Sequence, residues 1–291
     1  VLLASYNGAR WVGPPIESIH AHLGVDVRVF VSDDSSSDET PTIVASKLRS
    51  QDVLFPKEER MGSAAQNFFR LIRAIDPHDC DYVAFSDQDD IWFEDKLVHG
   101  IGKMRALKVE GYSSSIVALW PDGSESLIRK DFPQKRWDHL FESPGPGCSF
   151  ILTSKLVTAL QNHLGSESLK EESVVGDCHD WLIYAFARHH GYRWHIDSRP
   201  SLKYRQHPAN VMGAHVGFKA SWLRWNRLRG GWYRDRVLTI ASLIGAQKLP
   251  PIIRIKRLTF GDRLALAARF WSCRRRLRDS LVFAVALIFQ H

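Results

Sequence analysis

The sequence has few cysteines, no long apolar run and no recognisable leader. Its 291 residues include four cysteines, which are widely spaced and form no CxxC pair: Cys80, Cys148, Cys178 and Cys273. That spacing excludes a disulfide framework and a cysteine-type zinc site, and it fits a reducing compartment. The longest apolar run, Leu281–Phe289, has nine residues, whereas a membrane-spanning helix needs about 20. We therefore expect neither a secreted nor an integral membrane protein.

Two nucleotide-binding signatures are also missing. The chain contains neither GxGxxG nor GxxxxGK[ST], so a dinucleotide-binding fold and a P-loop lose their main support. No signal peptide is visible, but Val1 lies inside an apolar run, and we expect a short N-terminal piece to precede it. With 44% hydrophobic and 24% charged residues, the chain is typical of one large globular domain with an appendage rather than of extended disorder.

Positive charge is concentrated near the C-terminus. Between Lys219 and Arg278 there are 16 Lys and Arg residues against two acids, a net charge of +14, so the rest of the chain carries −7. Trp222, Trp225 and Leu264, Ala267, Ala268, Trp271 fall at helical spacing within this tail. A basic amphipathic helix with Trp and Leu can lie in a membrane interface. Packing of the same apolar face on the body is the structural alternative, and binding of nucleic acid is a weaker one.

Short β-rich runs alternate with amphipathic segments in the first 120 residues. This alternation predicts βαβ units around a largely parallel sheet. The expected strands are Val1–Ala4, Val27–Val31, Asp52–Phe55 and Tyr82–Phe85, with helices from an N-cap at Thr40 and over Ser63–Ile75. Residues 111–147 are rich in Gly and Pro and are expected to form loops. Further on we expect strands at 149–152, 193–196 and 202–204 and helices at 154–163 and 179–190.

Polar clusters follow three of these strands. They are Ser5-Tyr6-Asn7-Gly8, Ser32-Asp33-Asp34 and Ser86-Asp87-Gln88-Asp89-Asp90. Ligands of parallel sheets bind beyond the carboxyl ends of the strands, so these clusters should meet at one rim. Asp87 and Asp89 would project to the same side of an extended segment and could bind Mg²⁺ or Mn²⁺. An acidic loop that caps the next helix is the alternative, and Asp33 and Asp34 could be turn residues.

Two later clusters could complete such a site. Asp180 stands at a predicted helix start, where it is either an N-cap or a general base for an incoming hydroxyl. Tyr204-Arg205-Gln206-His207 ends a strand and could clamp a diphosphate or supply a metal ligand, although Arg and His at strand ends are usually structural.

Taken together, the clusters resemble the inverting family-two glycosyltransferases of the GT-A fold, especially the rhamnosyltransferase-like branch of bacterial polysaccharide biosynthesis. The similarity covers residues 1 to about 214. The matching stretches are Ala4–Gly8, Ser32–Asp34, Asn67-Phe68, Phe85–Trp92, Gly147-Cys148, His179–Trp181, Tyr204–His207 and Asn210-Val211.

The resemblance implies a role for each matching residue. Asp180 would be the catalytic base, with His179 and Trp181 on the acceptor side. Asp87, Asp89 and His207 would bind Mg²⁺ or Mn²⁺. The nucleotide-sugar donor would be bound by Ser5, Tyr6, Asn7, Asp33, Asp34, Asn67, Asp87 and Arg205. Ser35 departs from the family, which usually has Gly there, so we expect a reshaped loop.

The expected fold is therefore α/β of the GT-A type, a Rossmann-like, mainly parallel sheet flanked by helices, with a basic helical extension. Residues 1–216 would form the catalytic domain, with a donor half to about 110 and an acceptor half after it, and residues 217–291 a membrane-associating tail. The resemblance suggests transfer of rhamnose from dTDP-rhamnose to a saccharide or lipid-linked acceptor, by a cytoplasmic enzyme at the inner face of the cell membrane. A sugar nucleotidyltransferase and a non-catalytic membrane or nucleic-acid-binding protein are the alternatives, although the loop after the first strand lacks the former's Gly-rich basic pattern.

Overall fold

The central strands are buried on both sides because their side chains alternate between two hydrophobic layers. In β1 (Leu2–Ser5), Leu2 lies in one layer and Leu3 in the other. Phe85 and Ala84 of β4 (Tyr82–Asp87) divide in the same way. Strands of a parallel sheet covered by helices on both faces have this near-continuous apolar character. The chain is described here from a computed structural model over residues 1–56, 60–165, 178–207 and 231–289.

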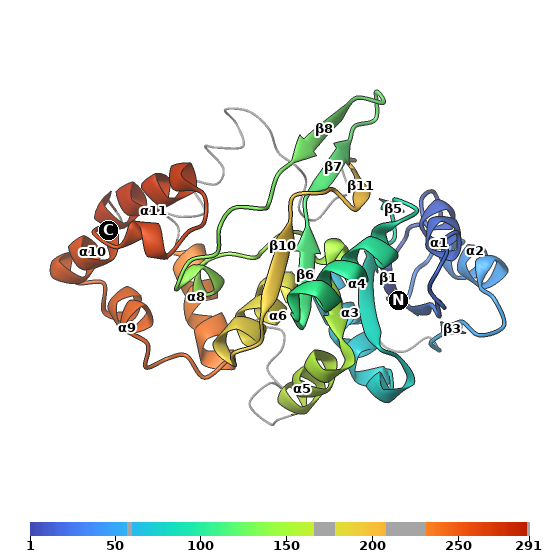
Figure 1. Cartoon of the computed structure of the whole chain (residues 1–291), viewed down its shortest axis with the longest axis horizontal. Coiled ribbons are helices and arrows are strands. Elements are labelled where there is room, and N and C mark those ends of the chain that lie inside the picture. Colours follow the sequence, from blue (N-terminus) through green and yellow to red (C-terminus); the bar gives the residue numbers. More distant parts are fainter. Residues whose placement is uncertain (57–59, 166–177, 208–230, 290–291) are drawn as a thin grey trace.

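Seven strands form the main sheet in the order β10-β6-β9-β4-β1-β2-β3 (Figure 1). β1 pairs in parallel with β2 and β4, whereas β9 runs antiparallel to both β4 and β6. A second sheet has the order β5-β11-β7-β8. The remaining strands are β2 (Phe30–Asp33), β3 (Val53–Leu54), β5 (Ile91–Trp92), β6 (Gly111–Ser114), β7 (Ile116–Leu119), β8 (Glu125–Ile128), β9 (Ile151–Thr153), β10 (Trp194–Asp197) and β11 (Leu202–Arg205). The expected mixed, mainly parallel sheet is confirmed.

Helices cover both faces of the main sheet. α1 (Gly13–His20), α2 (Thr40–Lys47) and α4 (Lys96–Leu107) bury their apolar residues in one layer. α3 (Ala64–Ala74), α5 (Ser154–Leu164) and α6 (His179–His189) contribute to the other. Two of the expected helix starts can be compared directly. The helix expected over Ser63–Ile75 is confirmed as α3, and Ser63 is its N-cap, with its hydroxyl accepting from Gln66 N at 3.3 Å. Thr40, in contrast, is the first residue of α2 rather than the expected N-cap.

The prediction of loops over residues 111–147 is wrong. This stretch contains β6, β7 and β8, followed by the short 3₁₀ helices η2 (Asp138–Leu140) and η3 (Gly147–Ser149). One of its glycines stands at a strand end because of close packing. A Cβ on Gly111 would lie 2.1 Å from Trp194 Cε3, so this glycine admits the tryptophan ring of the neighbouring strand β10. Long-range packing of this kind leaves no local pattern in a sequence.

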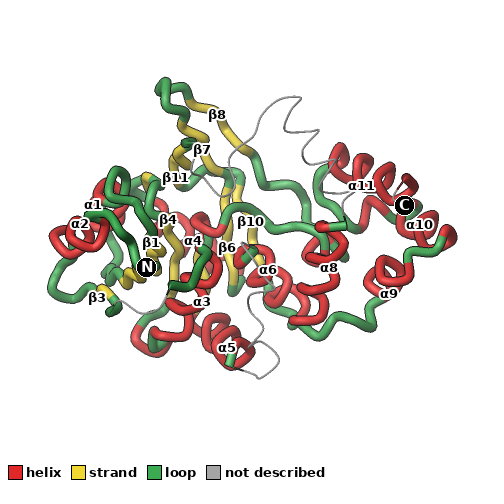
Figure 2. Tube along the Cα trace, turned by 180° about the vertical axis from the view of Figure 1, so that it is seen from behind, coloured by secondary structure: helices red, strands yellow, loops and turns green. Residues whose placement is uncertain are grey.

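The C-terminal extension packs on the body. It contains α8 (Trp232–Leu243), α9 (Pro250–Arg257), α10 (Phe260–Ala267), η6 (Phe270–Ser272) and α11 (Leu277–Phe289), which gather at one end of the molecule (Figures 1 and 2). Val237, Ile240 and Phe283 belong to the same hydrophobic cluster as Trp181 of α6. The expected domain boundary at 216/217 and the Trp222–Trp225 segment lie outside the described residues.

The expected helical stripe Leu264–Trp271 is interrupted. α10 ends at Ala267, and Trp271 falls in η6. Leu264 and Trp271 are 45% and 57% exposed, whereas Leu266 is buried. Within the described ranges, no helix combines the length and apolar character needed to cross a membrane. None of the four cysteines forms a disulfide.

A buried ionic cluster joins this extension to the body. Asp138 of η2 is fully buried and accepts from Tyr184 Oη at 2.9 Å and Arg188 Nη1 at 3.3 Å, both on α6. Arg275, from the extension, places Nη1 3.6 Å from Asp138 Oδ2, and its Nη2 donates to Ser143 O at 2.6 Å. Its Nε also lies 3.8 Å from Glu142 Oε1. The extension thus supplies part of the charge that a buried carboxylate requires.

We expect Arg275→Met to lower the free energy of unfolding by about 3 kcal/mol, measured by urea denaturation. Breaking one side of a buried ion pair costs roughly 3–5 kcal/mol, and the lower value applies because Arg188 still faces Asp138. Arg278→Met, at an exposed position of α11, is the matched control and should change stability by less than about 0.5 kcal/mol. Equal, small effects of the two substitutions would show that the ionic cluster does not stabilise the fold.

Candidate functional site

The carboxyl ends of β1 and β2 are joined by hydrogen bonds between side chains and loop backbone. Asp33 accepts from Ser5 Oγ at 3.0 Å, from Ser36 N at 2.8 Å and from Ser36 Oγ at 2.6 Å. Asn7 has a left-handed φ of 45°, donates from its N to Ser36 Oγ at 2.8 Å and accepts at Oδ1 from Ser37 N at 2.9 Å. Ser5, Asn7 and Asp33 therefore hold the rim in shape, and their contact with a nucleotide stays a prediction.

Gln88 joins the β1 loop to the acidic segment after β4. Its Oε1 accepts from Tyr6 N at 2.8 Å, and its Nε2 donates to Tyr6 O at 3.0 Å. A Cβ on Gly8 would lie 2.2 Å from Gln88 Oε1, so this close approach favours glycine. The Tyr6 ring stays exposed beneath the guanidinium of Arg60, 4.3 Å from its centroid. Sequence reasoning placed Gln88 in the acidic cluster but assigned it no role, because an amide between two acids has no distinctive pattern.

Asp34 lies at the same rim and faces another loop. Its carboxylate accepts from Gly62 N at 3.0 Å and from Met61 N, while Arg60 Nε lies 4.0 Å away. Ser35 keeps a left-handed φ of 59°, the region that glycine permits. The expected reshaping of this loop is therefore not seen: serine adopts the strained conformation instead, which costs roughly 1–2 kcal/mol.

Asn67 of α3 lies beneath the rim. It is 1% exposed, and its Nδ2 donates to Ser32 O at 2.8 Å and to Ser5 O at 3.3 Å. Asn67 thus clamps the ends of β1 and β2 together. Its predicted contact with the nucleotide sugar is not tested by these contacts.

Asp89 meets the residues that follow β11. Asp89 Oδ2 lies 2.7 Å from His207 Nε2, and Arg205 Nε donates to Asp89 O at 3.3 Å. Trp11 stacks on the His207 ring with centroids 5.4 Å apart, and the Arg205 guanidinium lies 4.8 Å from the Trp11 centroid. Burial raises the pKa of Asp89, and the adjacent His207 opposes that rise. The structure brings together Asp89, Arg205 and His207, and it adds Trp11, which sequence reasoning missed.

Asp87 is part of a different group from Asp89. Because β4 ends at Asp87 and a turn follows, the alternation of an extended segment does not continue to Asp89. Asp87, Asp90 and Cys148 each place one potential ligand atom within 4.8 Å of the others. Among the described residues, Asp87, Asp89 and His207 do not form one such group. The predicted metal ligands thus occupy two adjoining clusters.

The charges at this rim favour a cation. Desolvation, together with the charges of Asp89 and Asp180, raises the pKa of Asp87 to about 7, although part of the residue still reaches solvent. Both carboxylate oxygens of Asp90 are buried without a hydrogen-bond partner. Oxygen donors lacking a compensating charge suit Mg²⁺ or Mn²⁺, so the residues present fit a divalent cation.

Asp180 lies in the first turn of α6. The N-cap is Cys178, so Asp180 is the second helical residue, and its Oδ1 accepts from Trp181 N at 2.7 Å. The N-cap interpretation is therefore wrong, although a carboxylate in a first turn still interacts favourably with the helix dipole. The influence of Asp180 on Asp87 places the two carboxylates in one electrostatic environment.

The neighbours of Asp180 are packed against protein. The His179 ring lies on Phe68 with centroids 4.5 Å apart, and a Cβ on Gly147 would come within 2.3 Å of His179 Nε2. Trp181 is 6% exposed, and its Nε1 donates to His139 O at 3.0 Å. Both side chains thus position the helix start, and their contact with an acceptor stays a prediction.

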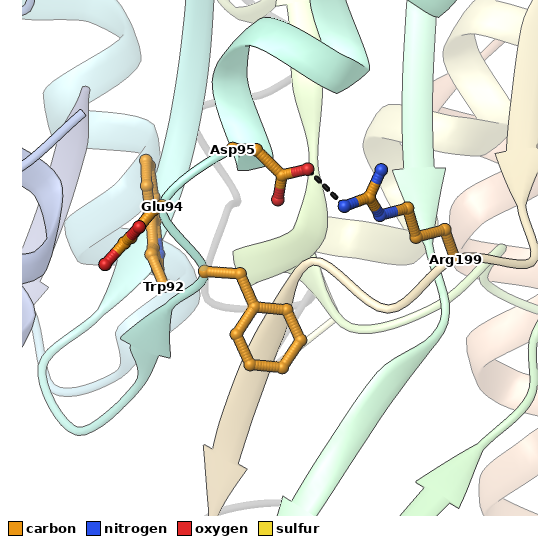
Figure 3. Close-up of a pocket in the computed structure, with 5 residues that line it drawn as sticks. Trp92, Glu94, Asp95 and Arg199 are labelled. Atoms are coloured by element: carbon orange, nitrogen blue, oxygen red, sulfur yellow. Dashed lines mark ion pairs between the residues drawn. The ribbon is translucent and has the colours of Figure 1, made fainter. Parts of the chain in front are cut away.

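An open pocket lies beside this rim (Figure 3). Its lining comes from the end of β5, the turn that follows it and the β10–β11 connection, and an Asp95–Arg199 ion pair crosses it. None of the predicted site residues lines this pocket. Trp92 connects the pocket to the neighbouring part of the site. The Lys96 ammonium lies over its ring, 3.3 Å from the ring centroid.

Comparisons of sequence identify relatives of the chain. The model of glycosyl transferase family 2 matches residues 1–139. The dTDP-rhamnosyl transferase RfbG of Shigella flexneri is 33% identical over 289 residues, covering 98% of this chain and 99% of that protein. An uncharacterized glycosyltransferase, RP339 of Rickettsia prowazekii (strain Madrid E), is 25% identical over 185 residues, or 58% of this chain and 54% of that protein.

Solved structures resemble the chain in fold. TarS 1–349 of S. aureus in complex with UDP-GlcNAc superposes with a TM-score of 0.55 at 13% identity, over 99% of this chain and 87% of that one. Mannosyltransferase PcManGT from Pyrobaculum calidifontis, in complex with GDP-Man and Mn²⁺, gives a TM-score of 0.50 at 15% identity, over 98% and 84%. The expected GT-A fold is confirmed.

The stack of Trp11 on His207 can be tested by substitution. We expect Trp11→Leu to weaken Mn²⁺-dependent binding of a nucleoside diphosphate about fivefold in calorimetric titration, because a stacked contact contributes roughly 1 kcal/mol. Trp271→Leu, which alters an exposed tryptophan of the extension, should leave the affinity unchanged. An unaltered affinity in Trp11→Leu would remove this residue from the site.

Proposed function

The chain belongs to glycosyl transferase family 2, and we propose that it is an inverting rhamnosyltransferase that uses dTDP-rhamnose. The family decides against a sugar nucleotidyltransferase and against a non-catalytic protein. The observation that carries the proposal is the near-full-length similarity to a dTDP-rhamnosyl transferase, which extends through the rim and the C-terminal extension alike. The proposed acceptor is a saccharide or a lipid-linked glycan of cell-surface polysaccharide biosynthesis, such as O-antigen.

The proposed reaction is a single displacement at the anomeric carbon. Asp180 accepts the proton of the acceptor hydroxyl as that oxygen forms a bond to the anomeric carbon. The bond from this carbon to the diphosphate oxygen breaks on the opposite face, so the configuration inverts and dTDP leaves with the bonding electrons. No covalent intermediate with the enzyme is needed.

The proposed donor site uses both clusters of the rim. Asp34, with Ser5, Tyr6, Asn7, Asp33 and Asn67 shaping the loops around it, would orient the nucleoside. Asp87 and Asp89, with His207 beside Asp89, would hold Mg²⁺ or Mn²⁺, which offsets the charge of the leaving diphosphate. Arg205 adds a positive charge on the same side, since its Nε donates to the Asp89 backbone. We assign this chemistry to a catalytic domain of residues 1–216, with a donor half to about 110 and an acceptor half after it.

We propose that the extension, residues 217–291, docks on the inner face of the cell membrane. Exposed apolar side chains gather on α10, η6 and α11: Phe260, Leu264, Trp271, Leu277, Leu281, Val282 and Val285. Arginines interleave with them, and each Lys or Arg near an anionic surface contributes about 1 kcal/mol. An apolar face edged by positive charge suits interfacial binding. The inward faces of these helices meanwhile pack on the body.

The donor assignment is tested by a screen of nucleotide sugars with and without Mn²⁺. We expect a thermal shift and slow hydrolysis with dTDP-rhamnose that are both lost in chelator. A selective response to another nucleotide sugar would overturn the donor while keeping the class of enzyme.

Asp180→Asn separates the base from a structural residue. An amide oxygen can still accept from Trp181 N, so stability and donor affinity should be unchanged. Turnover should fall by about 10²–10⁴-fold, the usual contribution of a positioned base. Asp235→Asn, which alters an exposed acid in the first turn of α8, is the matched control. Near wild-type turnover in Asp180→Asn would exclude Asp180 as the base.

Membrane docking is tested with the double variant Leu277→Glu, Leu281→Glu. The two side chains are 65% and 50% exposed, so the fold should be kept. Co-sedimentation with phosphatidylglycerol vesicles at low salt should be lost, and that of the wild type should fall in high salt. Leu127→Glu, on the exposed hairpin strand β8, should bind like the wild type. Equal binding by the wild type, the double variant and Leu127→Glu would contradict membrane docking through this surface.

A further inference from the structure

A thiol lies among the carboxylates behind the acidic rim. Cys148, in η3, packs against β4 and is fully buried. Its Sγ is one of the three potential ligand atoms, with Asp87 and Asp90, that lie within 4.8 Å of one another. Asp87 is the member of this group that reaches solvent, so an ion would enter past it.

Asp90 gives a second, independent indication of a cation site. It is 0% exposed, and both of its carboxylate oxygens lack a hydrogen-bond partner. The Cys148 sulfur faces this carboxyl group, within 4.8 Å of one of its oxygens. A buried carboxyl group without donors is costly as a carboxylate, so it is either protonated or compensated by a cation.

The nearby ammonium group of Lys96 does not meet this need. Lys96 is 1% exposed, and its Nζ donates to Cys148 O at 2.6 Å and covers the Trp92 ring. It thus adds one positive charge near two carboxylates but hydrogen-bonds to neither oxygen of Asp90. With both acids ionised, one negative charge remains uncompensated in the group.

We propose that Asp87, Asp90 and Cys148 form a binding site for a thiophilic divalent cation of the Zn²⁺ or Cd²⁺ class. Two carboxylate oxygens and one sulfur match the mixed donor sets that these ions accept, whereas Mg²⁺ prefers oxygen alone. Three protein ligands leave the fourth position of a tetrahedral ion open. On binding, the Cys148 S–H bond breaks, the sulfur forms a bond to the ion, and the proton passes to solvent.

This site would oppose the proposed reaction. Asp87 is shared with the proposed Mg²⁺ or Mn²⁺ ligands, so a soft ion would withdraw it from the donor site. Inhibition of transfer by Zn²⁺ or Cd²⁺ rests on the proposed function, but binding of the ion does not.

Binding is therefore measured directly, with Cd²⁺ as the probe. The full chain carrying Cys80→Ser and Cys178→Ser, which removes the two partly exposed thiols, is titrated without nucleotide. A Cd–thiolate bond gives a charge-transfer absorption in the ultraviolet, and we expect this band to saturate at one ion per chain. Adding Cys148→Ser should abolish the band. Adding Cys273→Ser, which removes the other buried thiol, should preserve it.

Asp90→Asn provides a second variant that keeps the thiol. Its Cd²⁺ affinity should fall by at least about tenfold, since loss of even an outer-shell partner costs 10–100-fold. The proposal is overturned if no band appears, if the band survives Cys148→Ser, or if Asp90→Asn binds Cd²⁺ like its parent. If Cys148→Ser does not fold, Asp90→Asn alone decides. Failure of sugar transfer with every donor would overturn the proposed function, but it would leave the measurements of Cd²⁺ binding unaffected.

Discussion

The accumulation of negative charge at the end of β4 is the constraint on which the site depends. Asp87, Asp89 and Asp90 fall within four residues, and burial raises the pKa of all three. Such a cluster is tolerated where protonation, positive groups or bound cations reduce its negative charge. The surrounding elements can be understood as sources of that compensation.

Positive groups reach this cluster from two directions. His207 reaches Asp89 from the end of β11 and is held there by the stack on Trp11. Lys96 approaches from the start of α4 beneath the sheet, and burial lowers its pKa to about 7. Asp90 has no such donor. A partly uncompensated site is less stable, a cost that functional sites commonly carry, and here it is consistent with the proposed binding of a cation.

The extension also compensates a buried carboxylate, away from the rim. Asp138 is fully buried and is met by Arg188 from α6 and Arg275 from the extension. Because α6 also carries Asp180, the extension supports the helix that presents the proposed base. Its basic residues thus divide into two groups: Arg274 and Arg275 pair with acids of the body, and others edge the outer apolar face. Removing the whole extension would disturb both the ion pairs with the body and the outer apolar face. Single substitutions therefore test each of them separately.

The sequence by itself determined the alternation of strands and helices and the polar clusters at the ends of β1, β2 and β4. These are local patterns, since a strand needs a short apolar run and its end needs a turn. Motif resemblance added the family, because Phe85–Trp92 and His179–Trp181 occur in its order. Strands β6–β8, the Gln88–Tyr6 pair and the stack of Trp11 on His207 could not be predicted in this way. Each depends on contacts between residues far apart in the chain, as between Gly111 and Trp194. The division of Asp87 and Asp89 between two clusters was likewise decided by the tertiary structure, because a turn follows β4 and the distant residues Cys148 and His207 lie beside different carboxylates.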